Sequence, residues 1–68
     1  MNTRDPKFMI FIRIGRDNFK RDGFTPEYTK DLFDSHTEDK ATEVKVLKYD
    51  TSECVAHSRR GQTIINNL

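Results

Sequence analysis

Apolar residues in this chain are gathered into a few short segments, and the most pronounced of them spans residues 7–14. After Lys7 the segment is rich in β-branched and aromatic residues, and it is too short for a typical helix. Alternate positions form one wholly apolar side (Phe8, Ile10, Ile12, Ile14) and one mixed side (Met9, Phe11, Arg13). The pattern predicts a central strand, or one covered on both faces.

A helix is expected over residues 26–35. Thr25 is suited to cap it with its hydroxyl, and Pro26 fits the first helical position, where no N–H is needed. The apolar residues recur at helical spacing: Phe24, Tyr28 and Leu32 at every fourth position, with Phe33 beside Leu32. We therefore expect the helix to lay an aromatic face on the sheet.

The remaining segments predict loops and further strands. Residues 15–23 have a loop composition, with glycine at each end and Asp-Asn inside. Residues 42–49 alternate with a period of two and predict a strand. After Asp50 the sequence fits either a short helix or, as we favour, a hairpin whose loop is 50–53 and whose returning strand is 54–58. Residues 62–68 form either a frayed tail or an added edge strand.

These elements predict a small βαββ domain of the α+β class. One helix packs on a short, mainly antiparallel three-stranded sheet, with an extra C-terminal edge strand as the alternative to a tail. A chain of 68 residues predicts one domain, residues 1–68, with frayed tails at 1–6 and 62–68. The expected core consists of eight residues: Phe8, Ile10, Ile12, Phe24, Tyr28, Leu32, Val44 and Val46.

The composition indicates a folded domain of marginal stability in a reducing compartment. Hydrophobic and charged residues each make up 34% of the chain, and twelve basic residues balance eleven acidic ones, which disfavours full disorder. The single cysteine, Cys54, forms no internal disulfide. The N-terminus has no apolar stretch like that of a signal peptide, and the longest apolar run is too short to span a bilayer. We therefore expect a cytoplasmic protein without a membrane partner.

No motif in the chain predicts catalysis or a bound cofactor. Cys54 and His57 could ligate a metal, but His36 is the only other soft ligand and a closed zinc site needs four. Residues three apart on a strand also point to opposite faces. The glycines of residues 15–23 match no nucleotide-binding fingerprint, and the acidic residues of 27–43 are typical of a solvated surface. No catalytic residue, metal or cofactor is expected.

The charges are sorted along the chain and suggest a binding surface. Four basic residues and one acidic residue lie between residues 13 and 21, whereas six acidic and two basic residues lie between 27 and 43. Phe19 lies among the basic residues, where it either anchors a loop on the core or forms an exposed contact. The predicted partner-binding residues are Arg13, Arg16, Phe19, Lys20 and Arg21.

Two functions fit this surface. The first is a non-catalytic module that binds a larger protein, which agrees with the near-zero net charge and the sorted charges. The alternative is a domain that binds single-stranded nucleic acid, with the basic residues on phosphates and Phe11 or Phe19 stacking on bases. Against the alternative, such domains are usually strongly basic, and an acidic helix would have to face away from the nucleic acid. Homodimerisation through open sheet edges is a third expectation.

The layout as a whole resembles that of one group of small proteins. The short length, the strand–helix–strand–strand order and the hairpin ending in Arg59-Arg60-Gly61 are similar to small accessory proteins of bacteriophages and prophages. Some of these inhibit host enzymes or act as antitoxins by direct contact. The resemblance implies an inhibitor of a host protein in the host cytoplasm, and it identifies no functional residue.

Overall fold

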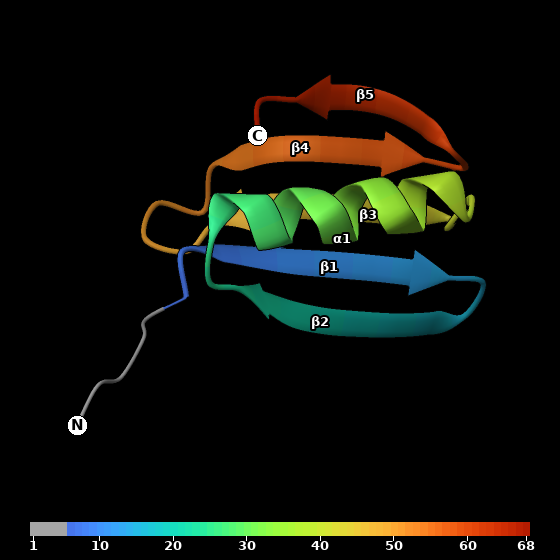
Figure 1. Ribbon diagram of the computed structural model, residues 1–68. Coiled ribbons are helices and arrows are strands. Elements are labelled where there is room, and N and C mark those ends of the chain that lie inside the picture. The colour runs from blue at the N-terminus through green and yellow to red at the C-terminus, as the bar shows by residue number, and fades with distance from the viewer. Residues whose placement is uncertain (1–5) are drawn as a thin grey trace.

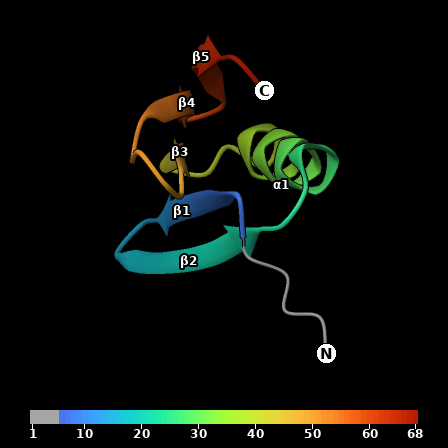
Figure 2. The same cartoon turned by 90° about the vertical axis from the view of Figure 1, so that its left-hand side faces the viewer.

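The computed structural model describes residues 6–68 and contains one helix and five strands (Figure 1). The elements are β1 (Phe8–Ile14), β2 (Asp17–Gly23), α1 (Pro26–Glu38), β3 (Glu43–Lys48), β4 (Cys54–Arg59) and β5 (Gln62–Asn66). The strands form a single antiparallel sheet in the order β2-β1-β3-β4-β5. α1 lies against one face of this sheet, and no element covers the other face within residues 6–68 (Figure 2).

The predicted three-stranded βαββ arrangement is wrong, because the sheet has five strands. The largest error concerns residues 15–23, where we expected a loop and the structure has β2. β1 lies inside the sheet and needs a hydrogen-bonding partner on each side, and β2 supplies the second one, from Ile14↔Asp17 to Phe8↔Gly23. Gly15, at φ 63°, allows the two-residue turn between them.

The frayed tail predicted at residues 62–68 is wrong, because the segment forms the edge strand β5, which was the alternative expectation. The hairpin after Asp50 is confirmed, since β4 returns antiparallel to β3. A second two-residue turn joins β4 to β5, and Arg60 and Gly61 both have positive φ, at 51° and 85°. This pair of angles is what short hairpin turns require. The frayed tail predicted at residues 1–6 lies outside the described residues, except for Pro6.

α1 begins where the sequence predicts and extends three residues further, to Glu38. The Thr25 hydroxyl accepts a hydrogen bond from the backbone N–H of Tyr28 at 3.1 Å, as a helix cap does. Thr29 and Phe33, four positions apart, are the residues of α1 that are fully buried against the sheet. Within residues 6–68, no helix is long and apolar enough to cross a membrane.

The core has as many residues as predicted, but it is centred on a different helix residue. The buried apolar residues are Ile10, Ile12, Phe33, Ala41, Val44, Val46, Val55 and Ala56, while Phe8, Leu32 and Leu68 pack at the margin. The predicted core positions Phe24 and Tyr28 are wrong, because they are 36% and 43% exposed. Successive helix residues are about 100° apart, so Tyr28 lies on a different face of α1 from Phe33.

Candidate functional site

The uncovered face of the sheet carries an unusual mixture of aromatic and basic side chains. Residues paired across antiparallel strands point to the same side, so the register assigns each residue to a face. Ile10, Ile12, Val44 and Val46 lie under α1; their neighbours along the strands therefore point the other way. We call this second side the open face. Its residues on β1 to β4 include Met9, Phe11, Arg13, Lys20, Asp22, Glu43, Lys45, Leu47, His57 and Arg59.

Phe11 occupies the middle of the open face. It pairs with Lys20 of β2 on one side and with Lys45 of β3 on the other. Its side chain is 38% exposed, although it lies on an inner strand. A hollow of about 380 Å³ adjoins it and is lined by eight residues: Phe11, Ile12, Arg13, Asn18, Phe19, Glu43, Lys45 and Leu47. An aromatic side chain with a cation on each side therefore borders an open hollow.

A second aromatic residue extends this arrangement beyond the end of β3. Tyr49 is 46% exposed, and the ammonium of Lys20 lies 5.9 Å from the centre of its ring. A cation at this distance is attracted to the face of the ring. Lys20 therefore lies within reach of two exposed aromatic residues, Phe11 and Tyr49.

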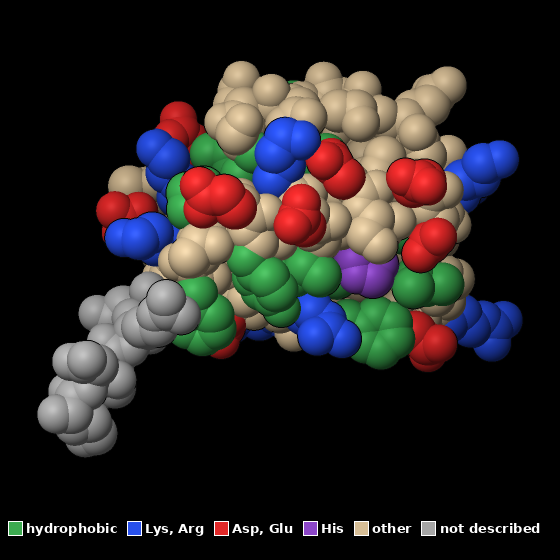
Figure 3. Space-filling view, viewed as in Figure 1, with side chains coloured by type: hydrophobic (Ala, Val, Ile, Leu, Met, Phe, Trp, Pro, Cys, Tyr) green, Lys and Arg blue, Asp and Glu red, His purple; other side chains and the backbone are tan. Residues whose placement is uncertain are grey.

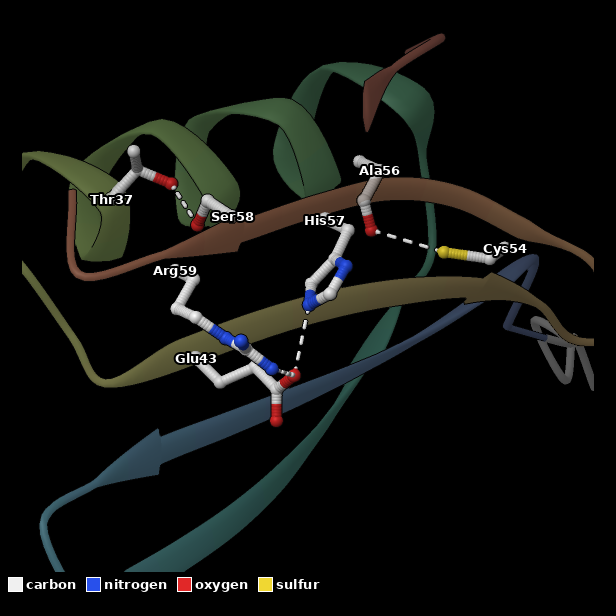
Figure 4. A network of polar contacts seen from close by, with 7 residues as sticks. All are labelled: Thr37, Glu43, Cys54, Ala56, His57, Ser58 and Arg59. Atoms are coloured by element: carbon white, nitrogen blue, oxygen red, sulfur yellow. Dashed lines mark hydrogen bonds and ion pairs between the residues drawn. The ribbon is translucent and has the colours of Figure 1, made fainter. Parts of the chain in front are cut away.

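Glu43 is held in place by two partners from β4 (Figure 4). Nε2 of His57 lies 2.9 Å from Oε2 of Glu43, and Nη2 of Arg59 lies 3.8 Å from the same oxygen. The hydrogen bond from His57 lowers the pKa of Glu43 below its ordinary value, against the opposing effect of burial, and Lys45 adds to the lowering. The carboxylate is therefore ionised and fixed in orientation at neutral pH.

The charges of the molecule are divided between its two sides. The open face has four basic residues (Arg13, Lys20, Lys45 and Arg59) and two acidic ones (Asp22 and Glu43). α1, on the other side of the sheet, has four exposed acidic residues and one lysine. Figure 3 shows the acidic side chains gathered over the helix. Among residues 6–68, Arg13, Lys20 and Lys45 form no ion pair.

The structure does not bring the five predicted binding residues into one patch. Arg13 and Lys20 lie on the open face. Phe19 and Arg21 pair with Ile12 and Ile10, and so point to the side of the sheet that carries α1. The fifth residue, Arg16, lies in the turn between β1 and β2.

The predicted site did not include Phe11, which was named only for the nucleic-acid alternative, nor did it include Glu43, Lys45 and Tyr49. The alternation of Glu43, Val44, Lys45 and Val46 already indicates that the charged residues share one side. What the pattern does not indicate is which strands lie next to each other. The neighbours of Phe11 come from segments far apart in the chain, so only the sheet order identifies them.

The prediction that Cys54 and His57 point to opposite faces is wrong. The register of β3 and β4 shifts between Val46 and Leu47, so that Cys54 pairs with Leu47 and His57 with Lys45, both on the open face. The thiol of Cys54 lies 3.5 Å from the carbonyl oxygen of Ala56. In the described part of the chain, no three His, Cys, Asp or Glu side chains are grouped so that they could hold a metal ion.

Comparison with known proteins assigns no family to this chain. No protein-family model matches it, and no curated protein or solved structure is significantly similar to it.

Proposed function

We propose that the protein binds single-stranded nucleic acid on the open face, without catalysis. The observation that carries the proposal is the position of Phe11, which is exposed at the centre of the sheet with Lys20 and Lys45 beside it. Exposed aromatic residues stack on unpaired bases, and each stacked base contributes about 1–3 kcal/mol. Lysines on either side of the ring are placed to contact the phosphates that precede and follow the stacked base.

The near-zero net charge of the chain does not oppose this function. Binding depends on the charges close to the binding surface. The acidic residues of α1 lie on the side of the sheet opposite to Phe11. Interactions between exposed charges are screened over about 8–10 Å in physiological salt. A strand on the open face therefore experiences mainly the charges of that face, where four basic residues outnumber Asp22 and Glu43. The acidic helix lies on the side of the sheet opposite to the proposed binding surface, and nucleic-acid binding requires this arrangement.

The proposal is tested by measuring the binding of fluorescently labelled 12-nucleotide single strands by anisotropy. Phe11→Ala is expected to weaken binding about fivefold or more, because it removes a stacking platform. Phe24→Ala is the matched control, since Phe24 is a phenylalanine of similar exposure (36% against 38%) that lies at the start of the helix and does not line the hollow. Equal loss of affinity in the two variants, or no binding by the unmodified protein, would refute the proposal.

A second candidate function, the binding of a larger protein, is favoured by a different surface. Ile14 and Phe19 are 48% and 49% exposed on the side of the sheet that carries α1. Phe24 and Tyr28 add exposed aromatic surface at the start of the helix. Figure 3 shows hydrophobic side chains along the boundary between α1 and β2. Exposed apolar patches of this kind are typical of protein interfaces.

The same two variants separate the candidates. In a pull-down from host-cell lysate treated with nuclease, a partner bound through the helix side is retained by Phe11→Ala and lost by Phe24→Ala. The opposite result assigns the protein contact to the open face and removes the support for this second surface. An inhibitor of a host protein, as the resemblance to phage accessory proteins implies, belongs to this second candidate.

A further inference from the structure

We infer that the hollow beside Phe11 is a subsite for a nucleobase that carries an exocyclic amino group, and that Glu43 recognises this group. The inference rests on the proposed nucleic-acid binding and goes further, because it names the kind of base that is preferred. It follows from the two kinds of surface that line the hollow. Phe11 and Leu47 are apolar, whereas Glu43 and Asn18 are polar groups that can recognise the edge of a base.

Only one oxygen of Glu43 is engaged within the described residues. Both His57 and Arg59 contact Oε2. Figure 4 shows the other carboxylate oxygen pointing away from both of them, and no hydrogen bond or ion pair reaches it from residues 6–68. The two partners from β4 therefore orient the carboxylate and leave one oxygen free to accept a hydrogen bond from a ligand.

The charge of Glu43 decides which part of a nucleotide enters the hollow. Arg13 and Lys45 also line the hollow, but an ionised carboxylate repels a phosphate, so the base is expected to lie against Glu43 and the phosphates against the cationic groups around Phe11. A carboxylate only accepts hydrogen bonds. Its lowered pKa keeps it in this state at neutral pH. The base must therefore supply a donor.

The bases differ in the donors that they present. Adenine, cytosine and guanine carry an exocyclic amino group, and a carboxylate that accepts from the cytosine amino group is a known specific contact. The only ring donor of thymine and uracil is N3–H, which lies between two carbonyl oxygens that repel a carboxylate. Stacking on Phe11 would bind all bases to a similar extent. The preference that we infer therefore comes from Glu43 and not from Phe11.

The test compares labelled 12-nucleotide strands of deoxycytidine, deoxyadenosine and thymidine. The unmodified protein is expected to bind the first two about fivefold or more tightly than thymidine, as one directed base contact contributes about 1–3 kcal/mol. Glu43→Leu, which removes the acceptor, is expected to remove most of this preference. Glu53→Leu is the control, because it removes one exposed acid outside the hollow and leaves the preference unchanged.

A third measurement avoids any change in the protein. A deoxycytidine strand with both amino hydrogens replaced by methyl groups is expected to bind the unmodified protein as weakly as the thymidine strand. Binding of all strands with equal affinity, or a preference that survives either the methylation or Glu43→Leu, overturns the inference alone. If no strand binds at all, the proposed function fails as well, so the two failures are distinguishable.

Discussion

Glu43 is the residue in which structure and proposed recognition are most closely linked. Its carboxylate accepts a hydrogen bond from His57 and lies near Arg59, and these contacts join β3 to β4 on the open face. The side chain is only 26% exposed, so the contacts are partly shielded from solvent. The pKa of Glu43 is lowered, chiefly by the hydrogen bond from His57. By linkage, this lowering means that the ionised side chain stabilises the fold.

The contribution of Glu43 to stability is expected to depend on pH. Because its folded pKa lies below the ordinary value of 4.5, the contribution is present above that value and is lost as the pH falls through the lowered folded pKa. Urea unfolding of the wild type and of Glu43→Gln is the measurement. The difference in their free energies of unfolding is expected to be largest near neutral pH and to shrink towards pH 3. A difference that stays constant with pH would contradict this assignment.

At the scale of elements, α1 is held to the sheet by a narrow strip of residues. Thr29 and Phe33 are fully buried, and the hydroxyl of Thr37 is hydrogen-bonded to that of Ser58 in β4 at 2.8 Å. Thr29 also packs against the end of β2, because a Cβ added to Gly23 would overlap its hydroxyl oxygen. The helix therefore depends on one large apolar side chain and on close contacts with small residues.

Phe33→Ala is expected to destabilise the protein by about 3–5 kcal/mol, because it opens a cavity in a small core. This is a large share of the stability of a domain of this size. Tyr28→Ala, at a 43% exposed position of the same helix, is expected to cost about 1 kcal/mol or less. Thermal and urea unfolding, followed by circular dichroism, measure the loss of stability in both variants. A greater loss of stability in Tyr28→Ala than in Phe33→Ala would mean that the helix packs through the face predicted from its sequence.

The contrast between β1 and β2 explains which elements could be predicted. β1 is dense in β-branched and aromatic residues, and its limits were found within one residue. β2 (Asp-Asn-Phe-Lys-Arg-Asp-Gly) has one apolar side chain and the composition of a loop. It is a strand because the backbone of β1 needs a partner on its second side, a requirement that no local pattern reveals.

At the scale of the whole molecule, the sheet separates two surfaces of opposite charge. Basic residues from β1, β2, β3 and β4 converge on the open face, and the acids of α1 lie on the other side. A polyanion is therefore expected to approach one side of the molecule only.

The salt dependence of binding is expected to reflect a small number of phosphate contacts. If Arg13, Lys20 and Lys45 each neutralise one phosphate, the plot of log affinity against log salt concentration has a slope of about −2, at about −0.7 per contact with a single strand. Lys20→Ala is expected to reduce this slope by about 0.7. Arg21→Ala, which removes a neighbouring charge on the other side of β2, is expected to leave it unchanged. Equal changes of the slope in the two variants would mean that the nucleic acid does not bind on the open face.

The sequence by itself determined the features that depend on near neighbours in the chain. The β1 strand, the start of α1 at Thr25 and Pro26, and the alternation in β3 follow from local composition and spacing. Only the tertiary structure decided that β2 is a strand, that Phe33 and not Tyr28 faces the sheet, and that Lys20 and Lys45 lie on either side of Phe11. These features depend on which strands pair and in what register, and pairing joins residues that are distant in sequence.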